Sequence, residues 1–429
     1  MSNPPLRLGI AGLGTVGVGV VRIVQRQAAL LAARTGLEIV ISAVTARTKD
    51  KDRGVRLTDY AWAEDAVALA RRDDVDVFVE LMGGSEGDAK TATEAAIAAG
   101  KSVVTANKAL LAMHGQALAE SAEVAGVAIK YEAAVAGGIP CIKALGEGLA
   151  GNEIARVMGV MNGTCNYILT RMQAAGLDYQ TVFAECEELG YLEADLTLDV
   201  GGIDAGHKLA LLVSLAFGTQ VDFDALQIEG IEKITIEDIE QAADMGYRIK
   251  LLGVAHKTGR GIDARMSPCL VPDQSPLGQL EGPMNMIVLE GDSVGQVVLR
   301  GAGAGEGPTA SAVMADVCDL ARGALGPVFG IPAGDLAPSE TAASPAPAAY
   351  YLRMELADKP GALAKIAAVL GDAGVSIDRM RQYGHDASTA PVLFVTHKAQ
   401  QSAVDVALDA MESTGVLASA PVALRIEEV

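Results

Sequence analysis

The feature that most constrains this chain is a glycine-rich turn near its start. A short apolar segment, residues 6–11, runs into a G-x-G-x-x-G turn, and a helical pattern then continues to about residue 34. Between a strand and a helix, such a turn is typical of a dinucleotide-binding βαβ unit, because its backbone can approach a pyrophosphate and the helix N-terminus offers free N–H groups. A glycine-rich turn without a ligand is the alternative. The predicted cofactor contacts here are Gly12, Leu13, Gly14, Thr15, Val16 and Gly17.

The segments after this turn alternate between strand and helix patterns. Strands are expected over residues 37–44, 75–81 and 102–106, and helices over residues 63–72 and 89–99. Strands alternating with helices of this length predict an α/β fold with a parallel, doubly wound sheet of the Rossmann type. We assign this dinucleotide-binding domain to residues 1–132.

Length, charge and cysteine content exclude several classes of protein. A chain of 429 residues is too long for one ordinary core, so two or three domains are expected. The net charge of −20, without a basic block, argues against nucleic-acid binding. Neither a signal peptide nor an unbroken apolar run of about 20 residues is evident, so we expect no membrane span. Five scattered cysteines without C-x-x-C spacing indicate reduced thiols and a cytoplasmic location.

The rest of the chain divides into an α+β domain, a linker and a small C-terminal module. Residues 133–300 contain strand candidates at 154–161, 249–256, 287–290 and 294–299. Residues 337–349 are rich in Pro, Ala, Ser and Thr, which predicts an extended, poorly packed linker. Residues 350–429 follow a βαββαβ order, which predicts a ferredoxin-like domain.

The end of the second strand discriminates between nicotinamide cofactors. In NAD-binding sheets an acidic residue at this point binds the ribose 2′-hydroxyl. Here the strand is followed by Arg47 and Lys49, which could hold a 2′-phosphate through charge-assisted hydrogen bonds. We therefore predict NADP(H), with NAD(H) as a second cofactor. The alternative is that both side chains are solvated surface charges.

Charged residues with catalytic potential occur in both large domains. Lys108 follows the predicted strand 102–106, at the carboxyl edge of the sheet where ligands of such folds bind. An acidic run, residues 187–199, precedes Asp204 and Lys208, which are four residues apart on an apolar helix. An exposed ion pair is the simple alternative, but a lysine on a largely buried helix is costly without a function.

These segments together resemble the homoserine dehydrogenase family. The run from Cys186 to Lys208 is similar to the family signature, although Cys186 and Leu196 depart from its usual residues. The glycine turn, residues 105–108 and residues 163–169 match further family segments in the same order, so the resemblance covers roughly residues 5–325. It implies reversible, NAD(P)H-dependent reduction of L-aspartate 4-semialdehyde to L-homoserine. It also implies that residues 133–300 form a catalytic and dimerisation domain, and that residues 301–330 complete the nucleotide-binding domain.

The resemblance and the chemistry together assign roles to individual residues. Hydride addition to an aldehyde leaves a developing alkoxide, which needs a proton donor and nearby positive charge. Lys208 is the expected general acid, and Lys108 is expected to polarise the carbonyl oxygen. Glu193 and Asp204 are expected to bind the substrate ammonium, and Asp199 to order the site. Gly163, Thr164 and Tyr191 are expected to line it, and Gly83, Thr105, Lys108 and Gly305 to complete the cofactor contacts.

The resemblance also implies a monovalent cation, Na+, held by main-chain oxygens. The corresponding residues in this sequence are Glu132, Val135, Gly137 and Ile139. Backbone ligands leave no pattern in a sequence, so the resemblance alone supports this site.

The C-terminal module resembles an ACT domain, with Asp358 and Gly361 in the turn that opens its first helix. The resemblance implies binding of an amino-acid effector near this turn, with L-threonine as the first candidate, and a homodimer or homotetramer. A module that only supports oligomerisation is the alternative. For the whole chain, the rival interpretations are a non-catalytic sensor of redox cofactor and amino acid, and a dehydrogenase of a related small semialdehyde.

Overall fold

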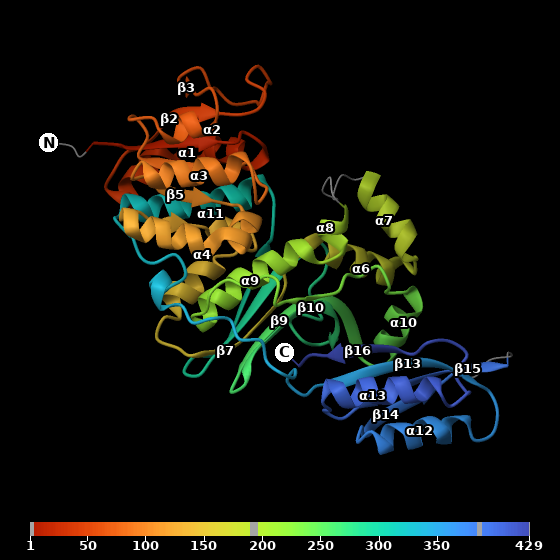
Figure 1. Cartoon of the computed structure of the whole chain (residues 1–429). Helices are drawn as coiled ribbons and strands as arrows, with labels where there is room; N and C mark the ends of the chain where they lie inside the picture. Colours follow the sequence, from red (N-terminus) through yellow and green to blue (C-terminus); the bar gives the residue numbers. More distant parts are fainter. Residues whose placement is uncertain (1–3, 189–195, 384–387, 429) are drawn as a thin grey trace.

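The chain forms a nucleotide-binding-type domain, a central domain and a C-terminal domain, which follow one another in space as in sequence (Figure 1). The structure, a computed structural model, describes residues 4–188, 196–383 and 388–428. The first and last domains lie at opposite ends of the molecule, and the sheet and helices of the central domain lie between them.

The N-terminal domain contains the predicted doubly wound sheet. Among the described residues its six parallel strands have the order β3-β2-β1-β4-β5-β6. The order reverses between β1 and β4, so the carboxyl ends of these two strands mark the crevice where ligands of such sheets bind. The strands are β1 (Leu6–Ala11), β2 (Ile39–Thr45), β3 (Ala61–Trp62), β4 (Val77–Glu80), β5 (Ser102–Thr105) and β6 (Ile129–Lys130). The helices are α1 (Thr15–Thr35), α2 (Ala66–Ala70), α3 (Asp88–Ala98) and α4 (Lys108–Ala125).

Helix α11 (Glu306–Ala321) packs against α1, although about 270 residues separate the two in the sequence. A Cβ on Gly19 would lie 2.9 Å from the Cβ of Ala310, so the missing side chain lets the helices approach closely. In the described part of the chain, α1 alone is long and apolar enough by composition to cross a membrane. Its buried face packs against α11 and β2.

The central domain is built on a mixed sheet with helices gathered on one face (Figure 1). Its strands follow the order β12-β11-β7-β9-β10. They are β7 (Ile154–Val160), β9 (Tyr247–Thr258), β10 (Gly261–Pro272), β11 (Met284–Gly291) and β12 (Gly295–Ala302), with β8 (Gln227–Ile228) paired to β10. The helices are α5 (Cys141–Lys143), α6 (Gly163–Ala175), α7 (Tyr179–Glu188), α8 (Leu196–Val200), α9 (Ile203–Phe217) and α10 (Ile236–Asp244).

The C-terminal domain has the predicted βαββαβ order and the strand order β16-β13-β15-β14. Its sheet continues that of the central domain, because β16 pairs with β10 in parallel at Cys269↔Arg425 and Leu270↔Ile426. The elements are β13 (Ala349–Ala357), α12 (Ala362–Asp372), β14 (Ile377–Gln382), β15 (Thr389–Thr396), α13 (Gln401–Glu412) and β16 (Val422–Ile426).

The linker, residues 337–349, runs along the central domain and is hydrogen-bonded to it at several points. Ala337 bridges to Thr219, and Thr341 bridges to Ile262 at the start of β10. The N–H of Ala346 donates to the Asp263 carboxylate at 2.9 Å, and Ala348 is 5% exposed. This extended segment thereby satisfies part of its backbone hydrogen bonding along the central domain.

A buried lysine on β9 supports the loop that approaches α6. The ammonium of Lys250 donates to the Asn166 side chain at 2.9 Å and to the Leu280 carbonyl oxygen. Burial, with a smaller contribution from Arg248, lowers the pKa of Lys250 to about 8.

This pKa predicts a pH dependence of stability. The folded protein releases the Lys250 proton near pH 8, whereas an unfolded chain holds it to about pH 10.5. The free energy of unfolding should therefore gain up to about 3 kcal/mol across that window, and Lys250→Met should abolish most of the gain. Urea denaturation from pH 7 to 10.5 measures it. Lys257→Met, on the same strand but 43% exposed, is the control and should keep the wild-type slope. If the free energy of unfolding rose equally with pH in wild type and in Lys250→Met, the assignment would be contradicted.

Candidate active site

The glycine turn places the N-terminus of α1 over the sheet's switch point. Gly12 has φ +101°, and a Cβ there would lie 2.4 Å from the Leu81 carbonyl oxygen, so a side chain cannot be accommodated. By contrast, a Cβ on Gly14 would have no atom within 4 Å. Gly14 is the N-cap of α1 and has no side chain that could cap the helix. The N–H groups of Thr15, Val16 and Gly17 therefore point outward from the N-terminal end of α1. This turn fits the phosphate of a dinucleotide.

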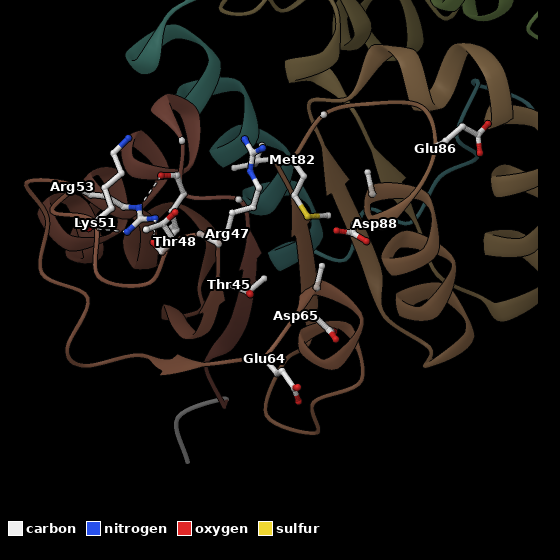
Figure 2. A pocket seen from close by; sticks show the side chains of 18 residues that line it. Thr45, Arg47, Thr48, Lys51, Arg53, Glu64, Asp65, Met82, Glu86 and Asp88 are labelled. Atoms are coloured by element: carbon white, nitrogen blue, oxygen red, sulfur yellow. Dashed lines mark hydrogen bonds between the residues drawn. The ribbon is translucent and has the colours of Figure 1, made fainter.

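A cavity of about 650 Å³ opens above this turn (Figure 2). It is lined by the turn, by the loop after β2 and by the loop after β4. The lining residues are Gly12, Leu13, Gly14, Thr45, Ala46, Arg47, Thr48, Lys51, Arg53, Glu64, Asp65, Ala66, Leu81, Met82, Gly83, Glu86, Asp88 and Ala89. Its size and concavity suit a small ligand or cofactor.

Three cationic side chains reach this cavity from the loop after β2. Arg47 extends from the end of the strand into the space between the two walls (Figure 2). Arg53 donates to the carbonyl oxygen of Leu13 at 3.0 Å, which ties the loop to the glycine turn. Lys51 is the third, whereas Lys49 lies beside the Trp62 ring, 5.8 Å from its centroid. Sequence reasoning missed Lys51 and Arg53, because loop residues beyond a strand carry no periodic signal.

A buried carboxylate organises the neighbouring strand ends. Glu80, at the end of β4, accepts hydrogen bonds from the N–H of Met82 at 2.7 Å and of Gly83 at 3.2 Å. It also accepts one from the Thr105 hydroxyl on β5 at 2.6 Å, and Thr105 in turn accepts from the N–H of Asn107 at 2.9 Å. Gly83, Thr105 and the start of α4 are thereby fixed relative to one another. Glu80 was not among the predicted residues, since it reads as the last residue of an apolar strand.

Asp204 joins two lysines from different domains. Its Oδ2 accepts from Lys208 Nζ at 2.6 Å within α9, and its Oδ1 pairs with Lys108 Nζ, at the start of α4, at 2.9 Å. Lys208 also donates to the Met161 carbonyl oxygen at 2.9 Å. Burial acts to raise the pKa of Asp204, but the two ammonium charges outweigh it and hold that pKa well below its ordinary value. The exposed-pair alternative fails, because Asp204 is 6% and Lys208 9% exposed.

The predicted lining residues of α6 lie beside this cluster. Asn162 caps α6 by accepting from the Cys165 N–H, and its side-chain amide donates to Asp199 at 2.9 Å. Gly163 and Thr164 form the first turn of α6, directly after this cap. Tyr191 and Glu193 lie outside the described residues, so the structure places neither. The sequence analysis did not predict Asn162 as a site residue, because an asparagine before a helix is explained by N-capping alone.

The predicted cation segment forms a buried turn against the β12–α11 connection. Ala136 is left-handed at φ 53°, and a Cβ on Gly137 would lie 2.4 Å from the Gly303 carbonyl oxygen. The Val135 carbonyl accepts weakly from the Cys141 thiol at 3.5 Å, and the Ile139 carbonyl accepts from the Cys141 N–H. Among the described residues no group of three His, Cys, Asp or Glu side chains is placed to hold a metal. A cation here would therefore depend on main-chain oxygens of this turn.

The Glu132 carboxylate is engaged in hydrogen bonds with the backbone of α5. It accepts from the N–H groups of Ile142 and Lys143, each at 2.9 Å. The Glu132 N–H in turn donates to Asp316 on α11, and Gly305 is the N-cap of that helix with φ 118°. Glu132 thus ties the turn to both α5 and α11.

Comparisons with known proteins agree on one family over nearly the whole chain. The family described as homoserine dehydrogenase matches residues 140–318, its NAD-binding domain matches residues 12–132, and the ACT domain matches residues 350–415. A homoserine dehydrogenase of Neisseria gonorrhoeae is 42% identical, and one of Pseudomonas aeruginosa 39%, each over 99% of both chains.

Solved structures give the same result. A crystal structure of a homoserine dehydrogenase from Thiobacillus denitrificans is 38% identical with a TM-score of 0.93, covering 99% of this chain and 98% of the other. A hyperthermophilic archaeal homoserine dehydrogenase mutant in complex with NADPH is 26% identical with a TM-score of 0.62, over 73% of this chain and 97% of the other.

The buried Asp204 pair predicts a large loss of stability when the carboxylate is neutralised. Asp204→Asn should reduce the free energy of unfolding by about 3 kcal/mol, because it leaves Lys208 buried without a counter-charge. Urea denaturation at pH 7 measures the loss. Glu94→Gln breaks the more exposed pair with Lys90 at 3.6 Å and should change stability by less than about 1 kcal/mol. Equal effects of the two substitutions would show that Asp204 is not held as the structure indicates.

Proposed function

This chain belongs to the homoserine dehydrogenase family, and from that premise we propose how its residues carry out the reaction. The protein is an NAD(P)-dependent oxidoreductase that acts on a CH–OH group, interconverting L-homoserine and L-aspartate 4-semialdehyde. The observation that carries the proposal is Asp204, which brings Lys108 of the first domain and Lys208 of the second to one carboxylate.

Lys208 is the general acid for aldehyde reduction and the general base for homoserine oxidation. The bound nicotinamide supplies or accepts the hydride. As the carbonyl carbon is reduced, negative charge grows on its oxygen, and Lys208 Nζ donates the proton that completes the hydroxyl. Lys108 Nζ faces the same oxygen and lowers the free energy of the developing charge. The Met161 carbonyl and Asp204 orient Lys208 so that its remaining N–H is free to point toward the substrate.

Carboxylates beside the lysines complete the substrate site. Glu193 and Asp204 bind the substrate ammonium, and Asp199 orders the site through its hydrogen bond with Asn162. Because both Asp204 oxygens already contact lysines, its main role is to position them, and Glu193 carries more of the ammonium binding. Gly163, Thr164 and Tyr191 line the site.

NADP(H) is the preferred cofactor, with NAD(H) as the second. The cationic side chain of Arg47 extends into the cavity over the glycine turn, with Lys51 and Arg53 on the same wall. Lys49 contributes less, because it is not among the residues that line this cavity. The archaeal homoserine dehydrogenase mutant is described in complex with NADPH, which supports NADP(H) as a cofactor here. Gly83, Thr105 and Gly305 approach the nicotinamide half.

The remaining assignments follow the same premise. Na+ is held by main-chain oxygens of Glu132, Val135, Gly137 and Ile139, in the turn strained at Ala136. Residues 1–132 with 301–330 bind nucleotide, residues 133–300 carry catalysis and dimerisation, and residues 350–429 regulate. The protein is a homodimer or homotetramer, and L-threonine is its effector. A cytoplasmic location is supported by five buried cysteines, all of them unpaired.

Removal of the proposed general acid should lower turnover by orders of magnitude. Lys208→Ala should lower kcat by about 10²–10⁴-fold, the usual contribution of acid–base catalysis. NADPH affinity, measured by fluorescence titration, should stay nearly unchanged, because Lys208 lies on α9 rather than on the cofactor cavity. Lys257→Ala is the control and should retain wild-type kcat. A loss of less than tenfold for Lys208→Ala would overturn the role.

Cofactor preference should depend on Arg47. Arg47→Ala should raise the KM for NADPH by at least about tenfold, the value of one charge-assisted hydrogen bond, and leave the KM for NADH unchanged. Lys49→Ala should have a smaller effect on NADPH. Initial rates with both cofactors test this prediction. Equal Michaelis constants for both cofactors in wild type, unchanged in Arg47→Ala, would contradict it.

A further inference from the structure

The segment after β2, which supplies the cations of the cofactor cavity, has no regular secondary structure. We call its residues 47–53 the β2 loop, and they form neither helix nor strand. Arg47 and Lys51 belong to this loop, and both are exposed and line the cavity. Because no helix or strand fixes this exposed segment, its shape depends on the contacts of its side chains.

Arg53 supplies these contacts from within the loop. Its Nη2 donates to the Thr48 carbonyl oxygen at 2.6 Å, and its Nη1 donates to that of Lys51 at 2.8 Å (Figure 2). Nη1 also donates to the Lys49 carbonyl oxygen at 3.4 Å, and Nε donates to the Leu13 carbonyl oxygen of the glycine turn at 3.0 Å. We call these four contacts the Arg53 clamp. They close the β2 loop on itself and attach it to the glycine turn.

The clamp gives Arg53 a different role from that of Arg47. Four of the five N–H groups of the Arg53 guanidinium are used by main-chain oxygens. The Arg47 side chain, by contrast, extends into the cavity (Figure 2). A lysine cannot form this clamp, because its donors lie on one nitrogen, whereas the planar fork of arginine carries them on three. The need for arginine at this position therefore comes from geometry and not from charge.

The single tryptophan of the chain lies beside the β2 loop. The ring of Trp62, on β3, is half-buried. Its centroid is 5.9 Å from Cζ of Arg53 and 5.8 Å from Nζ of Lys49, which is within the range of cation–π contacts. Release of the loop would expose this ring to solvent. The fluorescence of Trp62 therefore measures the state of the loop independently of catalysis.

A loop that is held in advance favours the cofactor that uses it. Ordering a flexible segment during binding costs conformational entropy, and a preformed site avoids that cost. The 2′-phosphate of NADP(H), which NAD(H) lacks, is the group proposed to bind the cations of this loop. The clamp should therefore lower the free energy of the NADP(H) complex more than that of the NAD(H) complex.

We propose that Arg53 is a positioning residue for cofactor selection, which holds the β2 loop so that Arg47 and Lys51 face the cavity before NADP(H) binds. The proposal rests on the proposed preference for NADP(H) over NAD(H). It makes that preference depend on the shape of the β2 loop, and the contribution of Arg53 comes from its hydrogen bonds to the backbone rather than from its charge.

The test is calorimetric titration of the full-length enzyme with NADP+ and with NAD+, for wild type, Arg53→Lys and Arg53→Met. The measured quantity is the ratio of the Kd for NAD+ to the Kd for NADP+. Arg53→Lys keeps the charge and loses the clamp, whereas Arg53→Met loses both. The ratio should fall at least about tenfold in both variants, because hydrogen bonds from a charged donor are lost.

Arg56→Lys and Arg56→Met are the matched controls. Arg56 follows shortly after the β2 loop, but its side chain is 73% exposed, pairs with Asp59 at 2.6 Å and is not among the residues that line the cavity. Both variants should keep the wild-type ratio. Acrylamide, a neutral quencher, should quench Trp62 more strongly in the cofactor-free Arg53 variants than in wild type, and equally in the Arg56 variants and wild type.

Arg53→Lys decides between shape and charge. If it keeps the wild-type ratio while Arg53→Met loses it, the charge of Arg53 acts directly and the proposal is wrong. An unchanged ratio in both variants would also overturn it, as would a lower ratio without stronger quenching of Trp62. If wild type binds NADP+ and NAD+ equally, the proposed cofactor preference fails first, and the role of Arg53 in selection fails with it.

Discussion

The carboxylate of Asp204 links the two halves of the site, since one oxygen pairs with Lys108 and the other with Lys208. The two lysines come from α4 of the nucleotide-binding domain and α9 of the central domain, so this contact also links the two domains. Burying three charges in this way costs desolvation free energy that well-packed apolar residues would avoid. We propose that the cluster serves the reaction, with the two ammonium groups converging on the oxygen that becomes the alkoxide.

A second buried carboxylate, that of Glu80, connects the segments beside the proposed cofactor site. Glu80 holds the ends of β4 and β5 and the Gly83 loop together. Lys108 follows directly from the segment that Glu80 orders through Thr105 and Asn107. The proposed nicotinamide contacts and Lys108, the lysine proposed to face the substrate, are therefore positioned by one network. A change at Glu80 would therefore act on both.

Much of the fold follows from local pattern, and the exceptions have physical causes. The glycine turn and the alternating apolar runs predicted the first domain, because each buried parallel strand is apolar on both faces. Strand β10 was missed because Asp263, Arg265 and Pro268 interrupt its apolar residues. These two charges are tolerated inside because they neutralise each other two residues apart on one face of the strand. Linker packing was also unpredictable, since it depends on backbone acceptors of residues far away in sequence.

The same limit applies to the candidate site. Asp204 and Lys208 could be identified because a four-residue spacing on an apolar helix is visible in the sequence. Asn162, Glu80 and Arg53 act through backbone groups of other segments, and such contacts leave no local pattern.

The central claim is that Asp204 positions Lys108 and Lys208 so that both act on the same substrate oxygen. A double-mutant cycle on kcat, with Lys108→Ala, Lys208→Ala and the double variant, tests this most directly. If the lysines act together, the double variant loses much less than the product of the two single losses, with an interaction free energy above about 1 kcal/mol. Additive effects, with the double variant equal to that product, would show that the lysines act independently and contradict the account.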